Sequence, residues 1–322
     1  MSYEMIWSTQ SGYLTNGMLN KRFRKSAQPL TKFRQFCEFK EAFGKSKGES
    51  VNWLKVANIG TYGRQITETE TIPETTQQLS WGTLTVTEYG MSIPFTFKID
   101  ALSEFDVQQL IRGGLLDDCV KVIDGTVETE FNKTPFRYGG TSTSTGTFYT
   151  ASSCTATNTS ALNTYHVDEM VAYLRQLNVP GFSGLNGDLV FIGTPKTLKG
   201  IKAALTSIYQ YTEMGLKYIA NGEIGRYNGV RFVESNFAGA YTFTPSTGAA
   251  TAVSWSGGYS APGYLFGGPT VREAVVVPEE LRVKIPTDYG RSQGIAWYGL
   301  FGWAIEWSDA ANARILKWDS KA

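Results

Sequence analysis

Residues 83–99 read TLTVTEYGMSIPFTFKI, and this stretch constrains the fold more than any other. From Tyr89 to Ile99 every odd position is apolar, whereas the even positions hold Gly, Ser, Pro, Thr and Lys. A strict period of two is typical of a β-strand with one buried face. At the start of the stretch, TLTVT, the phase is reversed, so we expect a bulge or a change of face near residues 88–90.

The length of this strand indicates that part of it projects from the body of the protein. Residues 83–99 would span on the order of 50 Å at ~3.3 Å per residue, whereas ordinary strands contain about 5–6 residues. The preceding stretch 66–83, ITETETIPETTQQLSWGT, is polar and rich in threonine, with little to form a core of its own. Another extended segment begins near Val51, and we therefore expect a two-stranded projection.

One long helix is predicted over residues 103–131. Ser103 with Asp106 three residues later resembles a capping box. Apolar residues then recur at every fourth position: Ile111, Leu115, Cys119, Ile123, Val127 and Phe131. Because this step is longer than one helical turn, the row winds around the helix, which should contact neighbours on more than one side. A bend is expected at Gly113–Gly114. The expected solvent-facing residues are Asp117, Lys121, Asp124 and Glu128.

The rest of the chain mixes short helices and strands. Helices are predicted at 165–177 and 195–209, and a hairpin or surface loop in the Ser/Thr/Gly-rich stretch 139–164. Strands are predicted at 188–193, 229–235, 263–266, 271–277, 281–285, 295–307 and 313–318. Because neither a regular βαβ order nor a repeat is visible, the predicted fold class is α+β.

Composition and charge limit the classes of function. The chain has 322 residues, 42% of them hydrophobic, and 30 basic residues against 29 acidic ones leave a net charge of +1. A protein that coats nucleic acid normally has a basic excess, and this one has none. Three scattered cysteines argue against a disulfide framework and a structural zinc site. The start carries no secretory signal, and the apolar stretch 294–305 is shorter than the roughly 20 residues that span a bilayer. We therefore expect a soluble protein of a reducing cytoplasm.

No residues stand out as a catalytic or cofactor site. His166 is the single histidine, which excludes a site with two histidine ligands, and we expect it to be a surface or capping residue. Gly44 opens a GKS sequence like the end of a phosphate-binding loop, but Phe39 stands where that pattern needs a glycine. We expect a non-enzymatic protein without metal or cofactor. An enzyme that acts on carbohydrates is the weaker alternative, because glycosidases need only two carboxylates.

A short motif points to a family. Residues 218–235, YIANGEIGRYNGVRFVES, closely resemble a motif of tailed-bacteriophage major capsid proteins with the Hong Kong 97 fold, in the branch that includes the podophage N-four capsid. The similarity continues at 138–141 and in IPTDYGRSQGIAWYGLFGWAI at 285–305, and it covers roughly residues 15–318. It implies a subunit that self-assembles into hexamers and pentamers, which form an icosahedral head around double-stranded DNA. The alternative is another phage structural protein, a tail or decoration component.

The resemblance also implies a division of the chain. Its segments are an N-terminal arm at 1–37, an extended loop of two long strands at 38–99, a peripheral domain with a spine helix (103–131) at 100–164, an axial domain at 165–285, and C-terminal strands that return to the peripheral domain at 286–322. Gly222, Gly225 and Gly229 would allow tight turns before the strand that starts at Val230. Residues 236–262 would form an axial loop or hairpin, or a neutral insertion.

The partners implied are copies of this chain, a separate scaffolding protein, a portal and a decoration protein. Contact with packaged DNA would be weak or transient, and no membrane is involved. The protein would be assembled in the cytoplasm of a bacterial host and would reside in the virion.

Charge patterning adds a hypothesis about the interface. Basic residues cluster between Lys21 and Arg34, and acidic residues outnumber basic ones along 100–131. The basic arm is expected to pack along the acidic helix of its own or an adjacent subunit; packaged DNA and plain solvent are the alternatives. The candidate interface residues are Lys21, Arg22, Arg24, Lys25, Trp53, Arg64, Glu74, Trp81, Asp117, Asp124 and Glu128.

Overall fold

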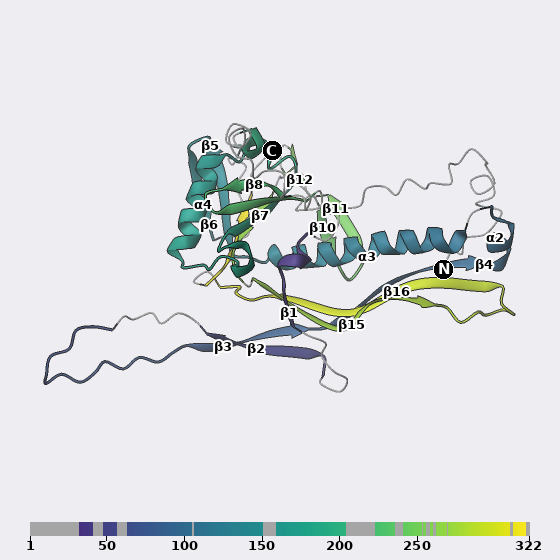
Figure 1. The fold of residues 1–322 in the computed structure, drawn as a ribbon, viewed down its shortest axis with the longest axis horizontal. Coiled ribbons are helices and arrows are strands. Elements are labelled where there is room, and N and C mark those ends of the chain that lie inside the picture. The colour runs from purple at the N-terminus through teal and green to yellow at the C-terminus, as the bar shows by residue number, and fades with distance from the viewer. Residues whose placement is uncertain are drawn as a thin grey trace.

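The structure is a computed structural model whose described residues form two larger sheets, three two-stranded sheets and one long helix (Figure 1). It describes residues 32–40, 48–56, 63–104, 106–150, 159–203, 223–235, 241–252, 254–255, 258–259, 262–268, 270–309 and 312–319. The mixture of helices and strands agrees with the predicted α+β class.

A four-stranded sheet lies beside the long helix α3 (Val107–Phe131). Its strand order is β1 (Glu38–Lys40), β15 (Val271–Val283), β16 (Ser292–Ile305) and β4 (Thr87–Thr96). The β1–β15 pair is parallel and the other two pairs are antiparallel. The strands predicted at 271–277 and 281–285 are one strand, β15, whose register against β16 shifts twice between Val275 and Glu280. Such bulges explain why its hydrophobic pattern looks interrupted in the sequence.

The predicted long strand is two strands followed by a helix. Strand β3 (Leu79–Thr85) ends and β4 begins around Val86, so the break lies just before the expected position at 88–90. The strand also ends at Thr96 rather than Ile99, because helix α2 (Phe97–Leu102) starts there. The pairing partner β16 begins at Ser292, opposite Thr96. The backbone N–H of Phe97 still donates to the carbonyl of Arg291 at 2.9 Å. After it, helix α2 satisfies the chain's own backbone groups.

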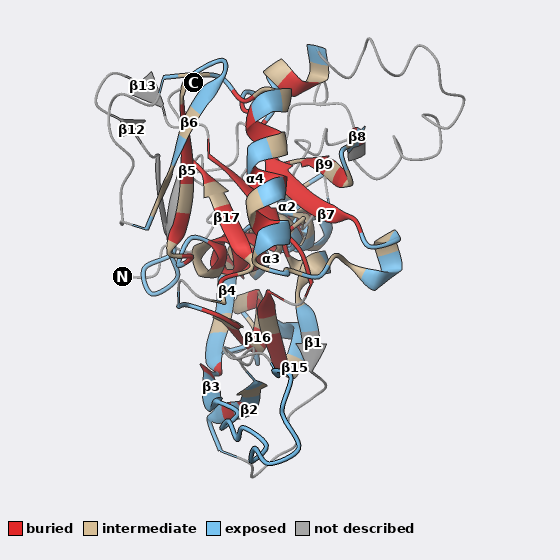
Figure 2. Cartoon of the chain, turned by 90° about the vertical axis from the view of Figure 1, so that its left-hand side faces the viewer, coloured by how far each residue is buried: buried red, intermediate tan, exposed pale blue. Residues whose placement is uncertain are grey.

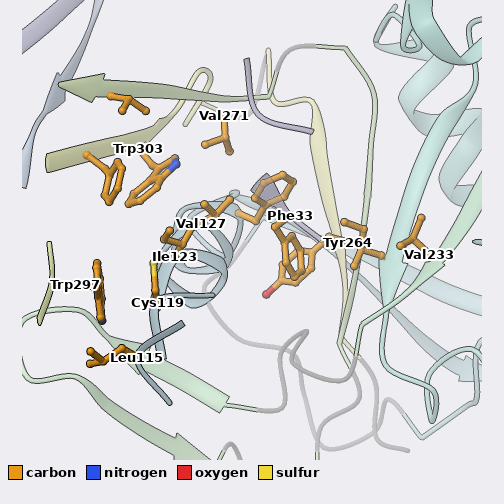
Figure 3. Close-up of a cluster of buried hydrophobic side chains, with 14 of the residues drawn as sticks. Phe33, Leu115, Cys119, Ile123, Val127, Val233, Tyr264, Val271, Trp297 and Trp303 are labelled. Carbon is orange, nitrogen blue, oxygen red and sulfur yellow. The ribbon is translucent and has the colours of Figure 1, made fainter. Parts of the chain in front are cut away.

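The apolar row of α3 is buried as predicted. Ile111, Leu115, Cys119, Ile123, Val127 and Phe131 all belong to one core cluster (Figure 3). The helix starts later than predicted: Asp106, not Ser103, is the N-cap, and its carboxylate accepts a hydrogen bond from the backbone N–H of Gln109. It continues through Gly113–Gly114 without interruption.

The other large sheet has seven strands. Its order is β6 (Thr145–Tyr149), β5 (Phe136–Ser142), β17 (Ile315–Trp318), β14 (Gly263–Phe266), β7 (Leu189–Gly193), β9 (Val230–Glu234) and β8 (Glu223–Tyr227). Alternate residues of β7 serve opposite faces. Val190 and Ile192 join the core around α3, whereas Leu189 and Phe191 pack with helix α4 (Thr164–Gln176). The sheet is therefore covered on both faces.

Several predicted elements in and around this sheet match the structure. Helix α4 agrees with the prediction at 165–177. The β5–β6 hairpin begins at Phe136, before the predicted stretch 139–164, and overlaps the start of that stretch. The helix predicted from 195 begins only at 199, and its part beyond 203 lies outside the described residues. The stretch 236–262 contains two short hairpins: β10 (Tyr241–Thr244) with β11 (Ala249–Ala252), and β12 (Ser254–Trp255) with β13 (Gly258–Tyr259).

The larger sheets combine strands from several of the predicted segments of the chain. The seven-stranded sheet takes strands from the segments 100–164, 165–285 and 286–322, and β15 pairs with β16 and β1 rather than with that sheet. The assignment of these segments to peripheral and axial domains stays a prediction.

The β2–β3 hairpin lies under the four-stranded sheet and leads to an exposed loop. Strand β2 (Ser50–Val56) pairs antiparallel with β3, and the described loop residues 63–78 are all exposed and contain no strand (Figures 1 and 2). A projection is therefore present, but residues 66–78, which were expected to belong to a two-stranded part of it, contain no strand. A small core cluster forms where the hairpin meets the sheet, from Val51, Trp53, Leu84, Val86 and Ala274.

The N-terminal segment 32–40 connects the two sheets. Phe33 is fully buried, and its ring makes edge contacts with Phe131 at 5.3 Å and Tyr264 at 5.7 Å (Figure 3). Phe36 packs against Phe266 of the seven-stranded sheet, and a few residues later β1 pairs with β15 of the four-stranded sheet.

We predict that Phe33→Ala destabilises the fold by about 3–5 kcal/mol, because it empties a fully enclosed site between the two sheets. Urea unfolding followed by tryptophan fluorescence would measure the loss. The exposed neighbour provides the control, since Gln35→Ala should change the free energy of unfolding by less than about 0.5 kcal/mol. Equal effects of the two substitutions would contradict the role given to Phe33.

Candidate interaction surfaces

One face of the β2–β3 hairpin exposes a row of large apolar side chains. Leu54 lies opposite Trp81, and Val56 lies opposite Leu79, so the four side chains share the face that points away from the body. All four are exposed, Trp81 to 71%. We call these four residues the outer hairpin face. Neighbouring apolar side chains that stay exposed typically mark a surface for binding another protein.

Trp53 is not on this surface. It lies opposite Gly82 on the inner face, is only 5% exposed and packs inside the chain itself. Trp53 is therefore buried within its own chain, and its expected contact with a neighbouring subunit stays a prediction. Strand alternation explains the difference. Trp81 pairs with Leu54, the residue after Trp53, and successive residues of a strand point to opposite faces.

The exposed loop 63–78 carries the candidates Arg64 and Glu74. Arg64 forms an ion pair with Glu70 within the loop, and Glu74 is exposed. Ile72 is exposed at the same loop. The structure thus places both candidates on the projection but does not bring them together with the outer hairpin face.

A second apolar surface, which the sequence analysis did not identify, lies at the far end of the molecule. Strands β15 and β16 are joined there by a turn in which Asp288, Tyr289 and Gly290 have positive φ. The exposed apolar residues at this end, which we call the distal tip, are Met91, Phe97, Leu102, Leu281, Val283, Ile285 and Tyr289. The only available signal was apolar side chains on both sides of a turn sequence, PTDYG.

Two of the three acidic candidates on α3 are internal. Asp124 is 3% exposed and Glu128 5%, which corrects the expectation that they face solvent. Asp124 Oδ1 accepts hydrogen bonds from the backbone N–H groups of Lys32 at 2.9 Å and Phe33 at 3.0 Å. Glu128 accepts one from the hydroxyl of Tyr264 at 3.3 Å. The N-terminal segment and β14 enclose this end of the helix, so Asp124 and Glu128 form hydrogen bonds with groups of the same chain. The third candidate, Asp117, is partly exposed.

The basic arm can be judged only at its end. Lys21, Arg22, Arg24 and Lys25 lie outside the described residues. Arg34 forms ion pairs at 2.9 Å with both Glu273 and Glu279 of β15, rather than with the helix. The last residues of the arm therefore meet α3 through backbone N–H groups and meet the sheet through a guanidinium.

The buried carboxyl group of Asp124 has an unusual pKa. Burial raises this pKa to about 6, although the backbone N–H groups of Phe33 and Lys32 act in the opposite direction. The folded protein therefore binds a proton more tightly than the unfolded chain, in which the pKa has its ordinary value of 3.8. The contribution of Asp124 to stability is full below that value and is lost as the pH rises through the window from 3.8 to about 6.

We predict that Asp124→Asn removes this pH dependence, because the amide keeps an acceptor for the two N–H groups but does not ionise. The stability of the variant relative to wild type should rise between pH 4 and pH 7. Asp124→Ala, which removes the acceptor, should cost about 1–3 kcal/mol. Urea unfolding of the three proteins over this pH range is the measurement, and a constant difference between wild type and Asp124→Asn would refute the assignment.

The described part of the motif, residues 223–235, forms a turn that is held by side-chain hydrogen bonds. Asn228 and Gly229 have φ of 46° and 73° and join β8 to β9. The carboxylate of Asp168 on α4 accepts hydrogen bonds from the hydroxyl of Tyr227 at 3.0 Å and from the amide of Asn228 at 2.8 Å. Buried Asp188 binds two arginines that flank the turn, Arg226 and Arg231. The motif thus fastens the edge of the seven-stranded sheet to α4.

The glycines of this motif have different positions. Gly229 occupies the turn, where its positive φ suits glycine. Gly225 lies within β8 at a shift of register against β9, so a turn there is not observed. Gly222 lies outside the described residues.

His166 is buried, contrary to the expectation of a surface or capping residue. Its ring lies 3.3 Å from the Tyr138 hydroxyl and 3.3 Å from the Ser160 hydroxyl. Burial lowers the pKa of the imidazole. Its role is therefore to complete a packed polar contact between β5 and α4.

Within the described residues, no group of three or more His, Cys, Asp or Glu side chains is placed to hold a metal ion. None of the described helices has the length and apolar character needed to cross a membrane.

Comparisons with known proteins identify the fold. No protein-family model matches the chain, and no curated protein matches it. Solved structures do match over nearly the whole length. The capsid structure of the cyanophage P-SCSP1u aligns with a TM-score of 0.64 and 13% identity, covering 97% of this chain and 94% of that chain. The capsid of Ralstonia phage GP4 aligns with a TM-score of 0.62 and 12% identity, covering 96% of each chain.

A third structural match comes from a different kind of particle. The capsid of a native GTA particle aligns over 100% of both chains, with a TM-score of 0.56 and 12% identity. Because these structures include capsids of phages from different hosts and align end to end, the fold of this chain is the phage capsid fold. The expected Hong Kong 97-type architecture is confirmed at the level of the fold.

Proposed function

We propose that this chain is the major capsid protein of a tailed bacteriophage, a non-catalytic subunit that assembles into hexamers and pentamers of an icosahedral head. The observation that carries the proposal is the end-to-end likeness to phage capsid proteins, which covers 97% of this chain and 94% of the cyanophage chain. The protein would then reside in the virion after assembly in the host cytoplasm.

The placement of the two apolar surfaces supports this role. The outer hairpin face lies under the body near the loop, and the distal tip lies at the opposite end of the four-stranded sheet (Figure 1). Different patches on one molecule favour head-to-tail contacts, which close into rings when the rotation allows it. Hexamers and pentamers are such rings. We propose that the outer hairpin face, with Trp81 at its centre, and the loop with Arg64 and Glu74 bind a neighbouring copy.

The other proposed partners follow from this role. They are a separate scaffolding protein, a portal and a decoration protein. With a net charge of +1, the chain would contact packaged DNA only weakly. A tail or decoration component of a phage is the second candidate function, and it would form small rings or trimers rather than shells.

We predict that replacing residues 64–78 with a short Gly-Ser linker leaves a folded subunit that forms no shells. The replaced residues are exposed and contribute nothing to the core, so the melting temperature should change little. Negative-stain electron microscopy and sedimentation would measure assembly, with the unaltered chain as the control. Normal shells from the shortened chain would contradict the role of the loop, and small rings or trimers from the unaltered chain would favour the second candidate.

The basic arm is the other proposed contact. Asp124 binds the backbone of residues 32–33, so the first described residue, Lys32, lies beside α3. We propose that the preceding residues, from Lys21 to Lys25, continue along the acidic helix of their own or an adjacent subunit, where Asp117 remains partly exposed.

Reversal of charge tests this contact. We predict that changing Lys21, Arg22 and Arg24 together to Glu impairs the assembly of empty shells, because the repulsion acts between protein groups. Particle yield without DNA, measured by sedimentation, is the readout. Changing the same residues to Gln should impair assembly less. If empty shells form normally and only DNA packaging fails, the arm binds DNA and the proposed contact is wrong.

A further inference from the structure

The β2–β3 hairpin is held on the body by side chains rather than by a shared sheet. It forms a separate two-stranded sheet, next to but not paired with β15 and β16. A single residue, Val86, separates it from β4, and the N–H of Val86 donates to the carbonyl of Glu49 at the base of the hairpin. The direction in which the hairpin points therefore depends on how its inner face packs against the body.

Trp53 is the central residue of that packing. Its ring lies directly over Gly82 of the opposite strand, where a Cβ atom would come within 2.2 Å of the ring. Any side chain at this position would displace the indole. The indole N–H is buried, and among the described residues it has no hydrogen-bond acceptor. Trp53 is thus positioned by the shape of its surroundings and by the charges next to its ring.

Two cations lie close to the ring. The ammonium of Lys55 lies 5.8 Å from the centre of the Trp53 ring and 5.4 Å from that of Trp307, so it stands between hairpin and body. The guanidinium of Arg272 lies 5.5 Å from the Trp53 ring. Arg272 is itself fixed by an ion pair with buried Glu306 at 3.0 Å. Cations over indole rings are attractive, more so where water is excluded.

A second close approach fixes the hairpin along β16. A Cβ atom on Gly302 would lie 2.4 Å from the side chain of Leu84 and 2.6 Å from the carbonyl oxygen of Thr85. The hairpin therefore approaches the sheet more closely than any residue with a side chain would permit. Close fits at Gly82 and at Gly302 leave little freedom for the hairpin to rotate or slide.

We propose that Trp53, held over Gly82 by Lys55 and Arg272, is a positioning residue that fixes the direction of the hairpin before any neighbouring copy binds. Trp53, buried within its own chain, acts by presenting the outer hairpin face and the loop in one orientation. A pre-ordered surface loses less conformational entropy on binding. The consequence for shells rests on the proposed function, whereas the positioning itself does not.

Hydrogen exchange measured on the unassembled full chain tests the positioning. In Trp53→Leu the amides of residues 50–56 and 79–85 should exchange roughly tenfold faster or more, with those of α3 and β7 unchanged. Trp81→Leu is the matched control, because it makes the same substitution on the outer face of the same hairpin, and it should leave exchange unchanged. Gly82→Ala should reproduce the effect of Trp53→Leu, because its methyl group occupies the place of the ring.

The outcomes separate the alternatives. Unchanged exchange of the hairpin in both Trp53→Leu and Gly82→Ala would overturn the proposal. Faster exchange that extends equally through α3 would also overturn it, because Trp53 would then be a general core residue. If the wild-type chain forms no shells, the proposed function fails while the exchange experiment still decides the positioning. If shells form, Trp53→Leu should reduce their yield or make their diameters uneven.

Discussion

The burial of one apolar row on α3 is the constraint on which the rest of the structure depends. Near its start the row packs against the four-stranded sheet, where the Trp297 indole also donates to Asp118 at 2.8 Å. At its end Phe131 stacks edge-on with Phe266 of the seven-stranded sheet, at 4.9 Å. A row that steps by four residues turns around the helix axis, and it can therefore serve two sheets that lie on different sides.

The N-terminal segment completes this arrangement. Phe33 fills the junction between the helix and β14, and Asp124 binds the backbone that carries it. The carboxylate of Asp124 is thus buried at a position that the sequence pattern assigns to the solvent-facing side of the helix. An isolated buried charge would be costly, and the two N–H groups from residues 32–33 offset part of that cost. The same residues therefore attach the N-terminal segment to α3 and complete the core: Asp124 binds the backbone of Phe33, and the Phe33 ring fills the junction.

The pairing of β2 with β3 places two tryptophans on opposite faces of the hairpin. Trp53 and Trp81 are the same residue type on the same hairpin, yet one lies in the core and the other faces solvent. The inner tryptophan orders the hairpin, and the outer one is available to another molecule. An ordered hairpin and an exposed apolar face are together what a subunit needs if its contacts with identical neighbours are to form in one geometry.

The sequence by itself determined the α+β class, the projection and the buried row on α3, because local periodicity records which side chains avoid water. It also marked Gly229, whose positive φ follows from the turn between two strands. Only the tertiary structure decided that Asp124 and Glu128 are internal and that Trp53 faces inward, since both depend on partners distant in the sequence. The distal tip is not evident from the sequence for the same reason: its residues come from β4, α2, β15 and the β15–β16 turn, and only folding brings them together.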